Sequence, residues 1–168
     1  MSNGGMISCD NEEDMKFFKK YRNFGRENTE YTYDITDEGF NFYLNNLNAS
    51  IGLAQLDKAE KNIKTRKRNY LEIKNGIFSR IGKFLCHDKH SSYYLSTLIL
   101  NDPAQEGLIS FLEENNIQAS YHYPPLHMTK FYKRKIAPLE NTEKLYKKII
   151  NLPIHQNLSD AQLQKLVE

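Results

Sequence analysis

The sequence predicts an α/β fold that consists of a strand–helix unit, a long helix and a small carboxyl-terminal α/β layer. A glycine pair leads directly into a short apolar stretch at residues 4–9, which is typical of a buried strand. Apolar residues recur at helical spacing from about residue 44 to residue 77. A run rich in aromatic and aliphatic residues at 93–100 then begins an alternation of strand-like and helix-like segments. The 168 residues fit one domain, or one domain and a piece of another.

The first helix is expected directly after the strand. Asp10 or Asn11 can cap it, and the acidic run 12–14 occupies its first turn, where the helix dipole favours negative charge. Gly25 is a plausible end for this helix, and residues 26–43 are expected to form a loop. A first strand without neighbours would expose unpaired backbone, so we expect a further segment to precede it.

The long helix is expected over residues 44–82. Its apolar positions are Leu44, Leu47, Ile51, Ala54 and Leu56, continued weakly by Ala59, Ile63, Tyr70, Ile73 and Ile77. Such a helix is much longer than the globular average, so we expect it to join two domains or to kink near Gly76.

The last part of the chain reads as strand–helix–strand–helix–helix. A strand at 93–100 ends at Asn101-Asp102-Pro103, and a helix follows at 104–114 with Leu108, Ile109, Phe111 and Leu112 directed inward. The next strand is expected at 117–123, where Pro124-Pro125 halts it. Two helices are expected after it, at about 140–150 and at 159–167, the second capped by Ser159.

Composition and charge exclude several classes of protein. Hydrophobic residues make up 39% and charged residues 26%, as in a soluble globular protein. The net charge of +2 is too small to indicate nucleic acid or an anionic membrane as the partner, and no apolar run is long enough to span a bilayer. The amino terminus does not resemble a secretory signal. Cys9 and Cys86 are therefore expected to be reduced thiols in a cytoplasmic protein.

Two segments are candidates for a binding site. Residues 121–127 place two histidines and two tyrosines at the end of the expected strand, and such a loop can present imidazoles and phenols to a ligand. The alternative is a rigid turn with incidental rings. Residues 39–44 precede the long helix and can meet an anion there, although Asn45 and Asn46 as ordinary helix caps are the favoured interpretation.

No other segment indicates catalysis or metal binding. Residues 87–90 contain His, Asp and His, but they lack a third strong ligand nearby, so a solvated loop is favoured over a metal site. The basic run between Lys58 and Arg68 is interrupted by acidic residues and is expected to be a solvated helix face. We find no nucleophile elbow and no cysteine with an evident histidine partner.

Five segments in order resemble the DegT/DnrJ family of pyridoxal-phosphate-dependent sugar aminotransferases. The first two are Gly4-Gly5-Met6-Ile7 with its Asn-Glu-Glu helix start, and the Arg-x-x-Gly end of that helix at 22–25. The third joins residues 39–42, similar to Gly-x-Asn-Tyr, to residues 49–56, similar to Ala-Ala-x-Gly-x-x-Gln-Leu. The fourth is the Tyr-Pro-hydrophobic-His loop at 122–127, and the fifth is the Leu-Pro segment at 152–155. The resemblance covers nearly the whole chain.

The resemblance implies the carboxyl-terminal portion of a fold-type I aminotransferase. Residues 1–43 would be a remnant of the large pyridoxal phosphate (PLP) binding domain, 44–82 the linking helix and 83–168 the small domain. The implied reaction moves an amino group, usually from glutamate, onto a nucleotide-linked keto-sugar, within a homodimer whose sites are shared. In the family the Schiff-base lysine lies about ten residues before the Gly-Gly-Met strand, upstream of Met1 here, so we expect no catalytic residue in this chain and no activity from it alone.

The resemblance also implies which residues face ligands. Asn41 matches the family position that reaches the cofactor phosphate or a nearby ligand of the neighbouring subunit, and Tyr43 stands where the family usually has Arg. His122, Tyr123 and His127 match the loop that lines the sugar-nucleotide pocket. The alternative function is a non-catalytic module, from a truncated or split gene, that binds a nucleotide sugar or mediates dimerisation.

Overall fold

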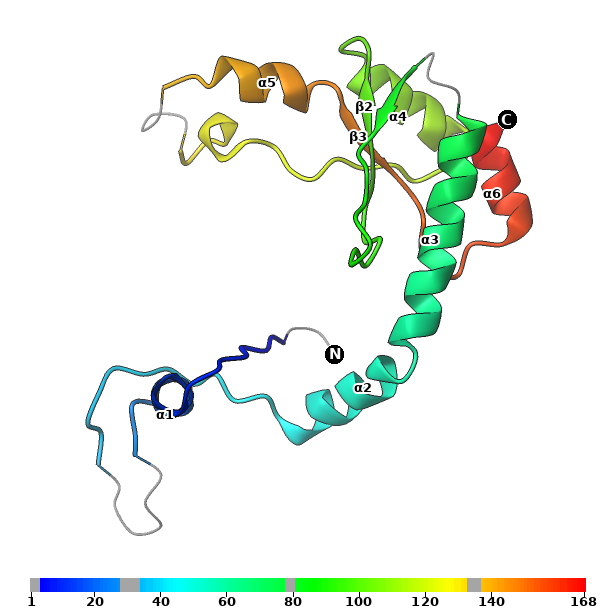
Figure 1. Cartoon of the computed structure of the whole chain (residues 1–168). Coiled ribbons are helices and arrows are strands. Elements are labelled where there is room, and N and C mark those ends of the chain that lie inside the picture. The colour runs from blue at the N-terminus through cyan, green and yellow to red at the C-terminus, as the bar shows by residue number, and fades with distance from the viewer. Residues whose placement is uncertain (1–3, 28–33, 78–80, 133–136) are drawn as a thin grey trace. The chain divides into compact units, whose positions relative to one another are not determined.

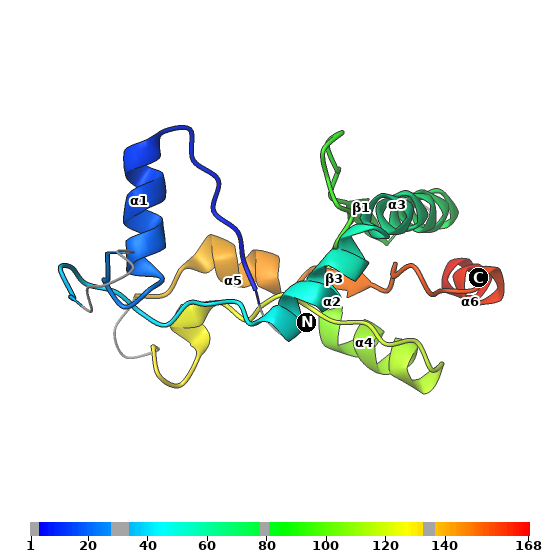
Figure 2. The same ribbon diagram turned by 90° about the horizontal axis from the view of Figure 1, so that it is seen from below.

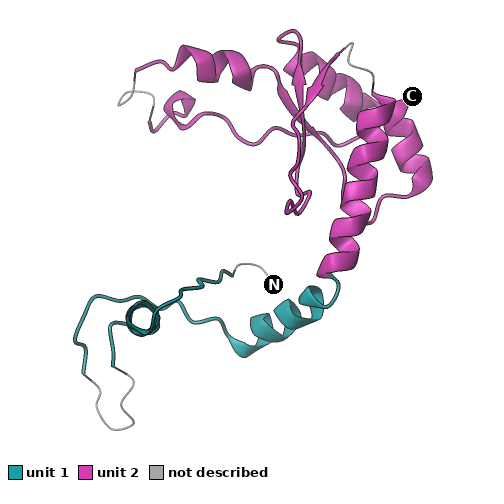
Figure 3. Cartoon of the chain, in the orientation of Figure 1, with its two compact units in different colours: residues 1–58 teal, residues 59–168 magenta. Residues whose placement is uncertain are grey.

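The structure is a computed structural model. It describes residues 4–27, 34–77, 81–132 and 137–168. The chain divides into two compact units, residues 1–58 and residues 59–168 (Figure 3). Parts of the expected loop at 26–43 and of the expected helix at 44–82 lie outside the described residues.

The first unit contains two helices, α1 (Glu12–Tyr21) and α2 (Asn46–Leu56), shown in Figure 1. The side chain of Asn11 accepts a hydrogen bond from the amide of Asp14 at 2.7 Å, which caps α1 as expected. Asn45 caps α2 in the same way by accepting from the amide of Asn48 at 2.8 Å, so the cap interpretation of this segment is confirmed.

The prediction of a strand at residues 4–9 is wrong. These residues form no regular secondary structure, and the side chain of Met6 is 93% exposed. A strand needs a neighbour to bond its backbone, and the described residues of the first unit contain no strand. The apolar residues at 4–9 are therefore not sufficient to form a strand.

The single helix expected over residues 44–82 is two helices, α2 and α3 (Ala59–Gly76). The amides of Asp57 and Lys58 bond to the carbonyls of Leu53 (3.2 Å) and Gln55 (3.1 Å) and close α2 with a tight turn. The break therefore comes at residues 57–58, whereas the sequence placed a kink near Gly76, where α3 ends.

The second unit contains a three-stranded antiparallel sheet in the order β1 (Gly82–Phe84), β2 (Ser96–Leu100) and β3 (Ile149–Leu152). Phe84 pairs with Leu98 across the first ladder, and Leu98 pairs with Ile150 across the second. The strand expected at 93–100 is present in shortened form as β2. β1 has only three residues and was not expected from the sequence.

Two expectations around β3 are wrong. The helix expected at 140–150 ends early as α5 (Glu140–Tyr146), and the β-branched pair Ile149-Ile150 begins β3. The strand expected at 117–123 is reduced to a single bridge between Ser120 and Asn151.

The remaining elements are α4 (Gln105–Glu114), the short 3₁₀ helix η1 (Leu126–Met128) and α6 (Asp160–Val167). Ser159 caps α6 with a complete capping box, as expected from the sequence. On α4, Leu112 is buried as expected, but Phe111 is 59% exposed, so its inward assignment is wrong.

One hydrophobic core serves the second unit. Helices α3 and α6 lie side by side in both views (Figures 1 and 2), and α4 contacts β3. The buried apolar residues come from the sheet, these three helices and the segments that join them: Tyr70, Ile73, Phe84, Tyr93, Leu98, Leu100, Leu112, Ala119, Ile150, Leu152, Ile154 and Leu163.

Candidate functional site

The candidate residues fall into two groups that belong to different units. Asn41 and Tyr43 lie in residues 1–58, whereas His122, Tyr123 and His127 lie in residues 59–168. Each group is described within its own unit.

Asn41 lies on a short extended segment that bonds to the end of α1. The amide of Phe40 donates to the carbonyl of Tyr21 at 2.8 Å, and the amide of Phe42 donates to the carbonyl of Arg22 at 3.1 Å. Asn41 itself forms an antiparallel bridge with Asn23. This pairing fixes the position of Asn41 relative to the last turn of α1.

Glycine permits the close approach of these two backbones. Gly25 has a φ of +73°, and a Cβ built there would lie 1.8 Å from the carbonyl oxygen of Asp37. A Cβ on Gly39 would lie 2.0 Å from the amide nitrogen of Gly25. Side chains at either position would push the two backbones apart.

Alternating side chains of this segment face opposite directions. Phe40 and Phe42 stack on each other at 5.3 Å and contact the ring of Tyr21. Tyr43 instead lies under the guanidinium of Arg22, 5.6 Å from its ring centroid. Asn41 alternates with the two phenylalanines, so its side chain faces away from the ring cluster that they form with Tyr21.

Arg22 supplies a cation to this segment, where its guanidinium lies over the ring of Tyr43, the residue that replaces the arginine of the resembled motif. Amides and guanidinium groups are both suited to an oxyanion such as a phosphate. The sequence placed Arg22 only at the end of the helix and gave it no role. Its cation–π contact with Tyr43 depends on the fold, and no signal in the sequence reveals it.

His122 is held by a side chain of β3. Its Nδ1 lies 3.0 Å from Nδ2 of Asn151, and the Asn151 side chain also accepts a hydrogen bond from Thr97 Oγ1 at 2.6 Å. Ser120 and Asn151 exchange two backbone hydrogen bonds, which sets the register of the 120–122 segment against β3. The sequence assigned no role to Asn151, which directly follows the helix expected at about 140–150.

His122 lines two hollows of the second unit. The larger has a volume of about 240 Å³ and contains two further basic side chains, Arg66 and His155. The smaller has a volume of about 150 Å³ and also contains Tyr123, whose side chain is 73% exposed. Among the described residues that line the larger hollow, none is Asp or Glu. Its charges therefore favour an anionic or oxygen-rich ligand.

His127 lies in neither hollow. It belongs to η1, is 7% exposed, and its Nε2 lies 3.0 Å from Oε1 of Glu143 on α5. The structure therefore places the buried His127 in contact with α5.

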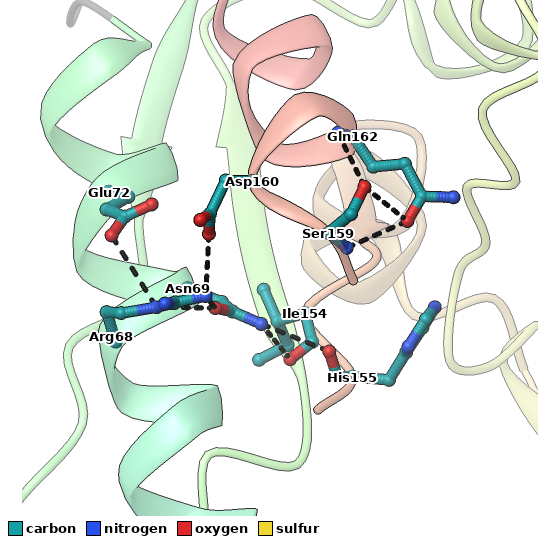
Figure 4. A network of polar contacts seen from close by, with 8 residues as sticks. All are labelled: Arg68, Asn69, Glu72, Ile154, His155, Ser159, Asp160 and Gln162. Atoms are coloured by element: carbon teal, nitrogen blue, oxygen red, sulfur yellow. Dashed lines mark hydrogen bonds and ion pairs between the residues drawn. The ribbon is translucent and has the colours of Figure 1, made fainter. Parts of the chain in front are cut away.

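The wall of the larger hollow is anchored to α3 by a polar network (Figure 4). Asn69 is fully buried, and its Nδ2 donates to the carbonyls of Ile154 (3.3 Å) and His155 (3.0 Å). The guanidinium of Arg68 donates to Oδ1 of the same amide and pairs with Asp160 at 3.2 Å. These bonds hold the Leu-Pro-Ile-His segment in place.

The described residues contain no group of three or more His, Cys, Asp or Glu side chains that could hold a metal ion. His87, considered with His90 in the sequence, uses both ring nitrogens, for Ser91 Oγ (2.6 Å) and for the carbonyl of Leu95 (3.0 Å). No helix in the described ranges has the length and apolar character needed to cross a membrane.

Comparison with known proteins identifies curated relatives among sugar-modifying enzymes. The chain is 29% identical over 96% of its length to UDP-4-amino-4,6-dideoxy-N-acetyl-beta-L-altrosamine transaminase of Campylobacter jejuni, of which it covers 46%. It is 30% identical over 81% of its length to GDP-perosamine synthase of Vibrio cholerae, of which it covers 38%. The chain thus spans less than half the length of these two relatives.

Solved structures similar to this chain are also aminotransferases. PseC of Helicobacter pylori, an aminotransferase involved in the biosynthesis of pseudoaminic acid, matches 94% of this chain with a TM-score of 0.83 and 25% identity. The PLP form of the putative sugar aminotransferase Spr1654 of Streptococcus pneumoniae matches 95% with a TM-score of 0.83 and 27% identity. The chain covers 45% and 43% of these two structures. The expected α/β aminotransferase fold is confirmed.

The family model described as the DegT/DnrJ/EryC1/StrS aminotransferase family matches residues 1–168. The resemblance first seen in five short segments therefore extends over the whole sequence, and this chain belongs to the DegT/DnrJ/EryC1/StrS aminotransferase family.

Proposed function

We propose that this chain forms part of the active site of a PLP-dependent enzyme that transfers an amino group from glutamate to a nucleotide-linked keto-sugar. The observation that carries the proposal is the Asn41 segment, which pairs with the end of α1 and contacts the guanidinium of Arg22 through Tyr43. The family match over residues 1–168 and the names of the curated relatives supply the reaction class.

The residues around Asn41 fit the phosphate end of the cofactor. Asn41 would donate from its amide, Arg22 would neutralise charge, and Tyr43 would hold the guanidinium in place from below. PLP, when bound, supplies an electron-withdrawing ring that lets the amino-bearing carbon lose and regain a proton. The chain's own contribution there is to bind and orient.

We propose that the lysine required for the chemistry lies outside these 168 residues and that the chain alone is inactive. Two lysines of α1 are engaged at its surface. Lys16 pairs with Glu12 at 3.2 Å, and Lys20 pairs with Glu27 at 3.1 Å. Because the chain spans less than half of its relatives' length, the remaining part of such an enzyme is large enough to carry that lysine.

The apolar surface of the first unit indicates where the rest of the enzyme attaches. Helix α2 has no buried residue, and its large apolar side chains are exposed: Leu47 (72%), Leu56 (68%), Leu53 (66%) and Ile51 (36%). Apolar surface of this extent typically forms an interface. We propose that it contacts an amino-terminal half of the enzyme, within a homodimer.

His122 and Tyr123 are the residues that we assign to the nucleotide sugar. Both line the smaller hollow, and His122 also lines the larger one, where Arg66 can attract phosphate oxygens. We assign His127 to the same loop as a positioning residue, because its hydrogen bond to Glu143 fixes the loop against α5.

An experiment that mixes this chain with an amino-terminal half tests the proposal. The full chain, an amino-terminal half encoded upstream of it, and the mixture of both are each incubated with PLP, glutamate and a UDP-linked 4-keto-sugar. The expected result is amino-sugar formation by the mixture and none by either part. Asn41→Ala is expected to lower activity of the mixture at least tenfold, while Asn75→Ala at an exposed position of α3 serves as the matched control. Amino-sugar formation by this chain alone contradicts the proposal.

A second candidate function is a non-catalytic module that binds a nucleotide sugar. The observation that favours it is that both hollows lie wholly within residues 59–168. Calorimetric titration of the chain with UDP distinguishes the two functions. Binding by the chain alone, with no gain of activity on mixing, supports the module, whereas activity that appears only on mixing supports the enzyme.

A further inference from the structure

Three side chains from three separate segments of the second unit form a hydrogen-bonded chain. Thr97 on β2 and Asn151 on β3 are direct cross-strand partners. Thr97 Oγ1 donates to Asn151 Oδ1 at 2.6 Å, and Asn151 Nδ2 lies 3.0 Å from His122 Nδ1. The backbone bonds between Ser120 and Asn151 keep His122 within reach of that amide.

The chemistry of the amide determines the state of the imidazole. An amide nitrogen only donates, so Nδ1 of His122 must accept and must carry no proton. A neutral imidazole then carries its proton on Nε2, on the other side of the ring. Asn151 is 4% exposed, so water competes little for its amide. A hydroxyl can donate or accept, and here Thr97 Oγ1 donates to the amide oxygen, which leaves the amide nitrogen for His122.

We propose that Asn151, oriented by Thr97, is a positioning residue that holds His122 in the Nε2–H form. His122 thereby presents a hydrogen-bond donor to an oxygen atom of the nucleotide sugar. The inference rests on the proposed function for the identity of that ligand. The position of the proton on His122 is a property of the chain without ligand and can be measured there.

The surroundings of His122 suit a donor. The larger hollow that His122 lines also contains the donors of Arg66 and the imidazole of His155, and the described residues around it include no carboxylate. A ligand with several oxygen acceptors would satisfy these groups together. A donor on Nε2 adds to this set, whereas an acceptor there would repel the same oxygen atoms.

The opposite arrangement makes a distinct prediction. If the Asn151 amide were turned over, its oxygen would accept from Nδ1–H, and Nε2 would be an acceptor. Both arrangements use the same heavy-atom positions, so an observation of the protons is decisive.

Nitrogen NMR on the full chain with ¹⁵N-labelled histidine provides that observation. Two-bond ¹H–¹⁵N spectra are recorded at about pH 8, above the ordinary histidine pKa of about 6.5, and His122→Gln assigns the signals. The expected result is an unprotonated Nδ1 and a protonated Nε2 for His122. A protonated Nδ1 in the unmodified chain overturns the inference.

A matched pair of variants tests the role of Thr97. Thr97→Val keeps the shape of the side chain but removes the hydroxyl, so the amide loses its orientation and His122 is expected to show a mixture of both forms. Thr97→Ser retains the hydroxyl and is expected to keep the Nε2–H form. Identical spectra for Thr97→Val and the unmodified chain overturn the role of Thr97.

Asn151→Asp replaces the donor by a carboxylate that can only accept, so Nδ1 of His122 is expected to become protonated. Preservation of the Nε2–H form in this variant, with the backbone spectrum unchanged, contradicts the positioning role of Asn151. None of these spectra requires a substrate. Failure of the chain to complement activity would therefore contradict the proposed function and leave the proton position intact.

Discussion

The imidazole Nε2 of His127 lies 3.0 Å from the Oε1 atom of Glu143, and this contact joins η1 to α5. The His127 side chain is 6% exposed and that of Glu143 is 33% exposed. A nearly buried imidazole that loses its partner retains an unsatisfied polar atom, which is costly.

Glu143→Ala is therefore expected to lower the free energy of unfolding by about 1–2 kcal/mol, while Glu143→Gln, which retains a hydrogen-bonding oxygen, loses less. Urea denaturation monitored by circular dichroism measures both. Glu140→Ala is the control, because Glu140 is 82% exposed and pairs with Lys144 on the helix surface. Equal losses for the Glu140 and Glu143 alanine variants would show that the contact does not stabilise the loop.

Asn69 joins α3 to the Leu-Pro-Ile-His segment, and its replacement should release that segment. Asn69→Ala leaves the carbonyls of Ile154 and His155 without their donor and is expected to cost about 1–3 kcal/mol. The amides of residues 154–156 should then exchange hydrogen faster. Lys67→Ala, at an exposed position of the same helix, should change neither quantity. Unchanged exchange in Asn69→Ala would contradict the anchoring role.

Alanine substitutions at Gly25 and at Gly107 are expected to have opposite effects on the structure. Gly25→Ala places a Cβ against the carbonyl of Asp37 at a φ of +73°, so the segment that carries Asn41 should separate from α1. Hydrogen exchange at the amide of Phe40, which bonds to Tyr21, measures the separation. Gly107→Ala lies on α4 with nothing within 4 Å, and it should stabilise the chain by about 0.5–1 kcal/mol. Retained protection of Phe40 in Gly25→Ala would count against the pairing.

Tyr70 should make stability fall at high pH. Burial raises the pKa of Tyr70 above its ordinary value of 10.0, and the nearby Lys74 opposes the shift. The folded state therefore holds the phenol proton more tightly than the unfolded state. Its contribution to stability is complete below about pH 10 and is lost as the pH rises through the folded-state pKa.

Tyr70→Phe removes this titration together with the hydrogen bond from the Tyr70 hydroxyl to the carbonyl of Leu85 (2.8 Å). The variant should lose about 0.5–1.5 kcal/mol at pH 8 and depend less on pH above pH 10 than the unmodified chain. Urea midpoints measured from about pH 8 to pH 11 give both values. Parallel pH curves for the two proteins would contradict the assignment.

The sequence predicted correctly those features that depend on neighbouring residues alone, above all the starts of helices. Asn11, Asn45 and Ser159 cap helices as their positions indicated, because a cap needs only its own first turn. The expected strand at 4–9 failed because its hydrogen bonds depend on a neighbour. β3 was missed because its two isoleucines follow a helix after a two-residue turn, and only pairing with β2 distinguishes them from a further helical turn.

The candidate site also divides into residues that a local motif identifies and residues whose role depends on distant contacts. Asn41 and His122 were identified by motif, whereas Arg22 and Asn151 were not, because their roles arise from contacts across the fold. His127 shared its motif with His122, but the side chain points to Glu143. Sequence spacing placed these residues in one loop and could not determine which of them face the surface.

Covalent trapping of PLP measures whether any lysine of this chain binds the cofactor. The full chain is incubated with PLP, reduced with borohydride and examined by intact mass and peptide mapping. We expect no lysine to carry the cofactor in stoichiometric amount, with at most partial labelling spread over exposed lysines such as Lys16. Complete modification of one lysine of this chain, with the absorbance band of a lysine-bound cofactor before reduction, would show that the chain itself supplies the lysine.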